Sequence, residues 1–298
     1  MTHPAEGAPD AAHDGLQDGA APTAAAVQPL LTTTSLGRYW VHESELASTN
    51  RTAATLAEAG APAGLVVTAE AQRAGRGRQG RVWHSPPGLN LYVSVVLRPA
   101  VAVPRVPQIA LVTGLALCRA LRQACPGVAV ALKWPNDLWV GSRKLAGILC
   151  EMDADGRRLR HVVVGVGLNV NLDRADCPPE LSERATSLRL ETGRAQSRPR
   201  LLAAFLNAFE PALGDWLRAD DLGPFLEEMD RLSMLRGRRL RIEAGERVVE
   251  GLAAGLAADG RLRLRTADGG EVLIHSGDAH VLPEMPAPAG NGPGRECR

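Results

Sequence analysis

The chain has 298 residues, of which 34 are Lys or Arg and 33 are Asp or Glu, so its formal net charge is +1. This balance gives no overall charge for binding nucleic acid or an anionic membrane surface, and any basic function must be local. Hydrophobic residues make up 45% of the sequence and aromatic residues only 3%, so we expect a core built mainly from Leu, Val, Ile and Ala.

The cysteines and the apolar segments indicate a cytoplasmic protein. The five cysteines are scattered, with no C-x-x-C pair and no Cys/His spacing typical of a metal site, which favours free thiols in a reducing compartment. No apolar run reaches the ~18 residues that a membrane helix needs. The N-terminal region lacks the pattern of a secretion signal and has no Arg before Arg38, which argues against export or a mitochondrial presequence.

Both ends of the chain have the composition of disordered tails. Residues 1–34 are rich in Ala, Pro, Gly and Asp and show neither a helical nor a strand period, and residues 284–298 are similar. Such segments have too little periodic apolar surface to form a core. We therefore predict two disordered tails around one ordered region.

The ordered region begins with alternating helix and strand patterns. Residues 48–60 predict a helix with Ser48 or Thr49 as its N-cap and a glycine at its end. Hydrophobic alternation over 89–97 predicts a strand with one drier face. The nearly apolar stretch 106–125 predicts a buried helix. Further patterns predict strands at 64–70, 128–134 and 160–172, a hairpin turning at 141–142, and an amphipathic helix over 199–217.

The sequence changes in character after about residue 235. Short strand patterns separated by Gly and Asp-Gly turns continue to residue 283, which is typical of a small all-β barrel. The fold class is therefore α+β, with a domain over 35–233 followed by a β-barrel over 235–283.

The motif GRGRQG at residues 75–80 could belong to either of two kinds of anion site. Its glycine spacing is that of a dinucleotide-binding turn, which must lead from a strand directly into a helix. Pro86 and Pro87 follow closely and the next segment alternates like a strand, which argues against this class. The alternative is a loop whose glycines turn backbone N–H groups toward an anion while its arginines bind phosphate or carboxylate. Taken alone, the motif is equally consistent with a solvated basic loop.

The loop is one of five motifs that occur in this order: STN (48–50), AEAQRAGRGRQGR (69–81), KWPNDLWV (133–140), RKLAGILCE (143–151) and GVGLNVN (165–171). In this combination the chain resembles the biotin–protein ligases, also called holocarboxylase synthetases, over roughly residues 37–283. The resemblance implies a catalytic domain related to class II aminoacyl-tRNA synthetases and a C-terminal SH3-like barrel. Some members carry an N-terminal winged helix-turn-helix and repress transcription. Fewer than 50 residues precede STN, so we expect the form without that DNA-binding domain.

The resemblance implies an ATP-dependent ligase. Such an enzyme joins biotin to ATP as biotinyl-5′-AMP, releases pyrophosphate, and transfers biotin to a lysine of the biotin carboxyl carrier domain of acetyl-CoA carboxylase or a related carboxylase. Biotin, ATP and Mg²⁺ would be required, and the sequence identifies no metal-ligating side chains; a homodimer stays open. Two alternatives remain, a lipoate–protein ligase and a non-enzymatic biotin sensor. GRGRQGR with KWPND favours biotin, and the missing DNA-binding segment argues against a sensor.

The resemblance also implies the binding residues. Neutral hydroxyls and amides suit the ureido ring of biotin, and cations with Mg²⁺ would neutralise the reacting carboxylate and α-phosphate. Biotin contacts fall on Ser48, Thr49, Asn50, Gln72, Arg76, Gly77, Arg78, Lys144, Gly147, Gly165 and Gly167. Nucleotide contacts fall on Arg78, Arg81, Trp83, Lys133, Asn136 and Asn169.

Several of these residues have a structural alternative. Ser48 and Thr49 also fit simple helix caps, and the glycines also fit a need to relieve crowding between strands. Trp83 fits either a cover for adenine or packing under the loop.

The transfer step requires a neutral acceptor lysine, although the unperturbed pKa of lysine is ~10.4. A carboxylate that accepts the proton or aims the amine would promote this step. We assign that role to Asp137 in KWPND, and we assign Arg78 and Lys144 as the catalytic cations. The structural alternative for Asp137 is a turn-capping residue after Pro135.

Overall fold

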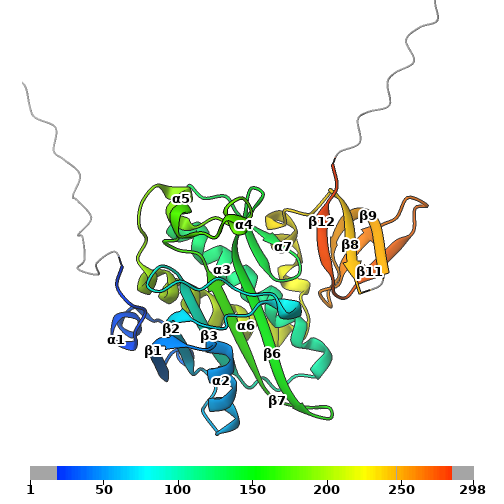
Figure 1. Cartoon of the computed structure of the whole chain (residues 1–298). Helices are drawn as coiled ribbons and strands as arrows, with labels where there is room; N and C mark the ends of the chain where they lie inside the picture. Colours follow the sequence, from blue (N-terminus) through cyan, green and yellow to red (C-terminus); the bar gives the residue numbers. More distant parts are fainter. Residues whose placement is uncertain (1–18, 246, 284–298) are drawn as a thin grey trace, which may run out of the picture.

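The computed structural model describes residues 19–245 and 247–283. These residues form a larger part of mixed helices and strands and, beside it, a smaller C-terminal sheet (Figure 1). In the part of the chain that the structure describes, no helix is long and apolar enough to cross a membrane.

A seven-stranded mixed sheet lies at the centre of the larger part, in the order β1-β2-β3-β7-β6-β5-β4. β1 and β2 pair in parallel, which requires a long crossover connection, and this connection contains a helix. The other neighbours pair antiparallel. The strands are β1 (Trp40–Leu46), β2 (Val66–Gln72), β3 (Leu91–Leu97), β4 (Val130–Lys133), β5 (Asp137–Val140), β6 (Arg143–Asp155) and β7 (Arg158–Leu168).

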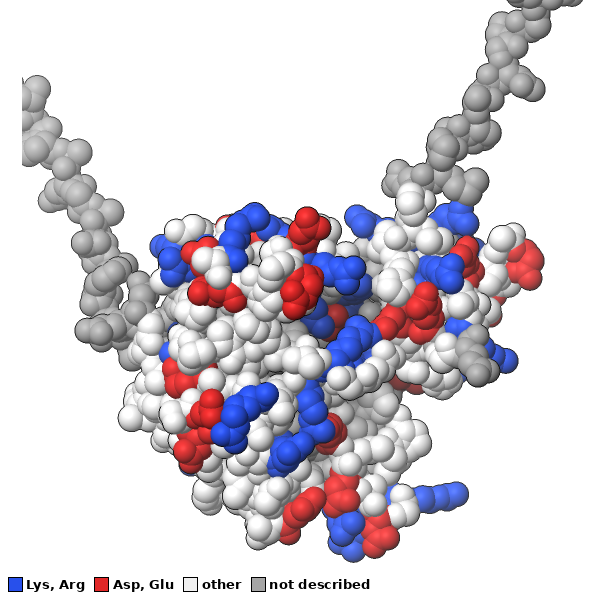
Figure 2. Space-filling view, viewed as in Figure 1, with Lys and Arg blue, Asp and Glu red and all other residues white. Residues whose placement is uncertain are grey.

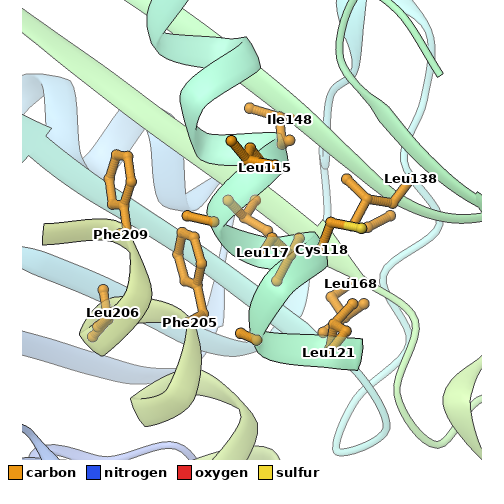
Figure 3. Packing of buried hydrophobic residues seen from close by; sticks show 14 of the residues in the cluster. Leu115, Leu117, Cys118, Leu121, Leu138, Ile148, Leu168, Phe205, Leu206 and Phe209 are labelled. Atoms are coloured by element: carbon orange, nitrogen blue, oxygen red, sulfur yellow. The ribbon is translucent and has the colours of Figure 1, made fainter. Parts of the chain in front are cut away.

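Two long helices, α3 (Val106–Ala124) and α6 (Arg198–Ala219), pack on each other and against one face of the sheet. Figure 3 shows their apolar side chains meeting, and the rings of Phe205 and Phe209 stack with centroids 5.4 Å apart. Both helices were predicted, α3 from its long and nearly apolar stretch and α6 from apolar residues that recur at helical spacing.

Helix α2 (Thr49–Glu58) covers part of the opposite face of the sheet. All seven residues of β3 are buried: Val93 and Val95 belong to the cluster under α3 and α6, and Val96 belongs to the cluster under α2. The prediction of one drier face for this strand is therefore wrong. The prediction fails because helices cover both faces of the sheet at β3, and a strand covered on both faces has no solvent-exposed side.

The prediction of disorder is also wrong for residues 19–34. They include α1 (Ala24–Val27) and a 3-10 turn, η1 (Gln28–Leu30), and Val27 is completely buried. Thr68 Oγ1 donates to the Pro22 carbonyl at 3.1 Å, and Glu210 of α6 accepts the backbone N–H groups of residues 34–36 at 2.6–2.8 Å. This order comes from distant partners rather than from local periodicity. The other predicted tail residues, 1–18 and 284–298, lie outside the described residues.

The C-terminal part is a five-stranded antiparallel sheet in the order β11-β10-β9-β8-β12, so the prediction that this region is all-β is confirmed. Trp134 of the KWPND motif joins its apolar core and donates from Nε1 to the Gly260 carbonyl at 3.1 Å. One motif residue therefore ties the two parts together. The strands are β8 (Arg239–Ala244), β9 (Arg247–Leu256), β10 (Leu262–Arg265), β11 (Glu271–Ile274) and β12 (Asp278–Val281).

Short helices and turns complete the described chain. They are η2 (Arg78–Gly80), η3 (Val103–Arg105), η4 (Arg174–Asp176), α4 (Pro179–Ser182), α5 (Leu188–Thr192), η5 (Gly223–Phe225) and α7 (Leu226–Leu232).

Candidate functional site

A cavity of about 570 Å³ lies over β5, β6 and β7, and β12 of the C-terminal sheet forms part of its wall. Figure 2 shows Lys and Arg side chains lying close to Asp and Glu side chains where the two parts of the molecule meet. The structure brings every residue that the sequence analysis assigned to the site to this cavity: Ser48, Thr49, Asn50, Gln72, Arg76, Gly77, Arg78, Arg81, Trp83, Lys133, Asn136, Asp137, Lys144, Gly147, Gly165, Gly167 and Asn169.

The glycine–arginine loop, residues 75–83, folds back on itself. Arg76 and Val82 form an isolated β-bridge, and Gly77 N–H donates to the Arg81 carbonyl at 2.7 Å. The 3-10 turn η2 is followed by strand β3 rather than by an α-helix. The loop is therefore not a dinucleotide-binding turn, as predicted.

The three arginines of this loop each contact a different part of the protein. The carboxylate partners of Arg76 and Arg81 offset part of the repulsion among the three, although these pairs are partly exposed and each adds little stability. The contacts are Arg76 Nη2 to Glu151 Oε1 on β6 (3.5 Å), Arg78 Nη1 to Asn136 Oδ1 (3.1 Å), and Arg81 to Asp278 on β12.

The side-chain amide of Asn50, in the first turn of α2, is already hydrogen-bonded within the protein. Its Oδ1 accepts from Ser94 Oγ at 2.6 Å, and its Nδ2 donates to Glu151 Oε2 at 2.7 Å and to the Leu149 carbonyl at 3.2 Å. A Cβ on Gly165 would lie 2.1 Å from Asn50 Oδ1. Relief of crowding therefore accounts for Gly165.

Gln72, at the end of β2, connects α2 with the segment after the loop. Its Oε1 accepts from the Thr49 backbone N–H at 2.9 Å and from Thr49 Oγ1 at 3.2 Å, and its Nε2 donates to Ser85 Oγ at 3.1 Å. Ser48 occupies the N-cap position of α2, as predicted, but its side chain makes no capping hydrogen bond. Gln72 provides that acceptor instead.

The indole of Trp83 lies on two glycines, Gly147 and Gly167, which pair across β6 and β7. We call these two residues the glycine floor. A Cβ on Gly167 would lie 2.5 Å from Trp83 Cε2, and one on Gly147 would lie 3.0 Å from Trp83 Cζ3. Lys144 Nζ lies 5.4 Å from the centroid of the same indole, whose Nε1 is buried without a hydrogen-bond partner. Both glycines therefore make room for Trp83, which packs inside the cavity.

Charged and aromatic side chains also meet on the sheet surface beside the glycine floor. Asp137 Oδ1 lies 2.7 Å from Lys144 Nζ, and Lys133 Nζ lies 4.0 Å from the centroid of the Trp139 ring. Burial is the main reason why the pKa of Lys133 is lowered from its ordinary value; Asp137 opposes this effect and Lys144 adds to it. The site thus holds concentrated positive charge in a partly dry surrounding.

Comparisons with known proteins identify the family. Residues 44–169 match the biotin/lipoate A/B protein ligase family and residues 236–281 match the biotin protein ligase C-terminal domain. The chain is 34% identical over 239 residues to the bifunctional ligase/repressor BirA of Bacillus subtilis, covering 80% of this chain and 73% of that protein. It is 35% identical over 233 residues to the biotin–[acetyl-CoA-carboxylase] ligase of Paracoccus denitrificans, covering 76% and 94%. The chain belongs to the biotin protein ligase family.

The fold agrees with this membership. The structure matches a biotin protein ligase from Aquifex aeolicus in complex with biotin and ATP with a TM-score of 0.71 and 28% identity, over 83% of this chain and 100% of that one. A mixed-sheet catalytic domain followed by a C-terminal antiparallel sheet domain is thus the biotin protein ligase fold.

Part of the cavity wall in this member of the family was missed by the sequence analysis. Lys144 N–H donates to the Arg184 carbonyl at 2.7 Å, and Asn169 Nδ2 donates to the Thr186 carbonyl at 3.0 Å, so a distant segment lies against two site residues. No local pattern signals such contacts. Other missed residues did have a signal, because Trp134, Pro135, Trp139, Ile148, Leu149 and Val166 lie within the quoted motifs. The missed lining residues are Val82, His84, Trp134, Pro135, Trp139, Ile148, Leu149, Val166, Leu172, Cys177, Leu181, Arg184, Ala185, Asp278, Ala279 and His280.

Proposed function

We propose that this chain activates biotin with ATP to give biotinyl-5′-AMP and pyrophosphate, and then transfers biotin to a lysine of a biotin carboxyl carrier domain. The observation that carries the proposal is the convergence of the glycine–arginine loop, KWPND, Lys144 and the glycine floor on one cavity. Family membership adds the substrates, since a relative is named a biotin–[acetyl-CoA-carboxylase] ligase and a similar structure holds biotin and ATP.

Adenylate formation brings two anions together, the biotin carboxylate and the α-phosphate. Arg78 and Lys144 are our catalytic cations for this step, with Arg81 and Lys133 beside them, because fixed cations in a partly dry cavity stabilise developing negative charge. Lys144 lies at the junction of the glycine floor and the loop, where both anions would meet.

Mg²⁺ is implied by the use of ATP, and the residues present fit a nucleotide-borne ion. The described residues contain no group of three or more His, Cys, Asp or Glu that could hold a metal. Mg²⁺ commonly binds through one or two carboxylates together with substrate phosphates, and Asp137 and Asp278 line the cavity. When bound, the ion would neutralise phosphate charge.

For the transfer step, we propose that Asp137 accepts the proton of the acceptor lysine or aims its amine. Asp137 Oδ1 lies 2.7 Å from Lys144 Nζ, so the lysine occupies this carboxylate in the ligand-free arrangement. Anionic substrates would give Lys144 other partners and leave Asp137 facing the incoming amine.

The remaining assignments divide into contacts and positioning groups. For biotin we propose Ser48, Thr49, Arg76, Gly77 and Arg78 as contacts, and Asn50 and Gln72 as residues that fix α2 and the loop, because their amides are already bonded to protein. Trp83 and Asn169 remain our nucleotide contacts. Asn136 would instead position Arg78, which donates a hydrogen bond to its side chain.

The finer fold assignments are also proposals. They are a class II synthetase-like catalytic domain, which we extend to include residues 19–34, and an SH3-like barrel over 235–283. The mixed sheet with its helical cover and the five-stranded antiparallel sheet support them. A carboxylase carrier domain as partner, a cytoplasmic location and a homodimer belong to the same proposal.

The test is pyrophosphate release from purified protein with ATP·Mg²⁺ and biotin, with lipoate in parallel. We expect biotin-dependent release and a stable protein-bound adenylate. Pyrophosphate release with lipoate but not with biotin would show that lipoate is the substrate. Tight biotin binding without pyrophosphate release, with either biotin or lipoate, would indicate a non-enzymatic biotin sensor.

A further inference from the structure

Trp139 lies in the cavity wall beside two charged residues of the site, Lys133 and Asp137. β4 and β5 pair with Lys133 opposite Asp137 and Ala131 opposite Trp139. Residues opposite each other in neighbouring strands share a face, as do residues two apart in one strand. Lys133, Asp137 and Trp139 therefore face the same side, and all three line the cavity.

The cations of this cavity differ in their partners. Lys144 is paired with Asp137, Arg76 with Glu151 and Arg81 with Asp278. Within residues 19–245 and 247–283, Lys133 has no carboxylate within ion-pair distance, and its ammonium lies 4.0 Å from the centroid of the Trp139 ring. An incoming phosphate must displace or compete with a carboxylate at Lys144 and Arg81, but at Lys133 it meets a cation held by a weak aromatic partner.

We propose that Trp139 is a positioning residue: its ring face holds the Lys133 ammonium in the cavity, where Lys133 binds nucleotide phosphate without first losing an ion pair. The inference rests on the proposed function, which supplies the nucleotide. Because a cation is attracted to the indole face by the ring's quadrupole, the contact fixes a flexible lysine while leaving its N–H donors available to an anion.

The test is a double-mutant cycle on ATP binding. ATP·Mg²⁺ and, separately, biotin are titrated by calorimetry into the wild type, Trp139→Leu, Trp139→Phe, Lys133→Met and both Trp139 variants combined with Lys133→Met. Trp139→Leu should weaken ATP binding by about 2- to 30-fold, the range that a cation–π contact supplies. Trp139→Phe should weaken it less, and biotin affinity should change less than twofold.

The cycle decides whether Trp139 acts through Lys133. In the Lys133→Met background, the Trp139 variants should cause no further loss of ATP affinity. An equal loss in both backgrounds, or equal weakening of biotin and ATP, would overturn the proposal. If Trp139→Leu does not fold, the Trp139→Phe cycle gives the same decision.

A matched control lies outside the cavity. Arg105 is 4.6 Å from the centroid of the Trp216 ring, and Arg105→Met breaks that contact while keeping the buried indole. ATP affinity should not change in this variant.

The proposed function and the positioning role of Trp139 fail in different ways. Wild-type protein that binds ATP but releases no biotin-dependent pyrophosphate contradicts the proposed function, whereas an active wild type with an additive cycle contradicts the positioning role alone. Wild-type protein that does not bind ATP contradicts both.

Discussion

Replacement of Gly167 by Ala should move the indole of Trp83 and weaken ligand binding while leaving the protein folded. The added Cβ would lie 2.5 Å from Trp83 Cε2, 2.6 Å from Nε1 and 2.8 Å from Cζ2. Favourable carbon–carbon separations are ~3.5–4.0 Å, so the ring must move by about 1 Å. Gly167 is in a regular strand without a left-handed backbone, so an alanine backbone fits there.

The cost divides between stability and binding. Overpacking costs ~1–3 kcal/mol, and alanine recovers ~0.5–1 kcal/mol relative to glycine in a strand, so the unfolding free energy should fall by at most about 2.5 kcal/mol. Trp83 belongs to a loop and is able to move, which lowers this cost further. If the moved ring must be pushed back when ligand binds, a penalty of ~1–2 kcal/mol weakens binding by about 5- to 30-fold.

Calorimetry with a non-hydrolysable biotinyl-adenylate analogue measures the binding term, and urea unfolding measures the stability term. Gly165→Ala is the matched control, because its Cβ would lie 2.1 Å from Asn50 Oδ1 within a buried hydrogen-bonded cluster. It should lose more stability than Gly167→Ala. Gly147→Ala should have the smallest effect, since its nearest contacts are 3.0 and 3.2 Å. Unchanged analogue affinity in Gly167→Ala, with a stability loss equal to that of Gly165→Ala, would refute this reasoning.

Four further predictions address chemistry, folding and pH. Asp137→Asn should slow biotin transfer more than adenylate formation, and equal losses in single-turnover rates of the two steps would contradict its assigned role. Glu210→Ala should lower the unfolding free energy by roughly 1–3 kcal/mol, because three backbone N–H groups lose a charged acceptor; an unchanged urea midpoint would exclude this anchor. A hydrogen bond from Arg119 lowers the pKa of Glu228, so the stability advantage over Glu228→Gln should be present above the ordinary carboxyl pKa of ~4.3 and disappear as pH falls through the lowered folded value. Urea unfolding at neutral and acidic pH tests this, and a difference independent of pH would be inconsistent with it. Burial raises the pKa of Cys118 to about 12, so iodoacetamide at mildly alkaline pH should label this thiol only after unfolding, as measured by mass spectrometry.

Much of the fold and the position of the site could be predicted from the sequence. Helix α3 follows from a long, nearly apolar stretch and helix α6 from apolar spacing. The hairpin between β5 and β6 follows from a Gly-Ser turn, and Pro86 and Pro87 argue against a helix after the glycine–arginine loop. Every site residue that we assigned from the motifs lines one cavity. These features depend on neighbours in sequence or on short fixed spacings, which a single sequence displays directly.

Other features depend on partners far apart in the chain, and only the tertiary structure decided them. Residues 19–34 are ordered because Thr68 and Glu210 bind them, and β3 is buried on both faces because α2 lies opposite α3. Sequence composition indicates the tendency of a segment to form a helix or a strand. It does not indicate which distant surface that segment packs against.

The same division holds within the site. The sequence supplied the types of residue that bind anions and the loop that carries them. The tertiary structure decided that Asn50 bonds to Ser94 and Glu151, that two glycines make room for Trp83, and that Trp139 lies under Lys133. The physical reason is that a hydrogen bond or a ring contact depends on distances between separate strands, and these distances are set only when the whole sheet has formed.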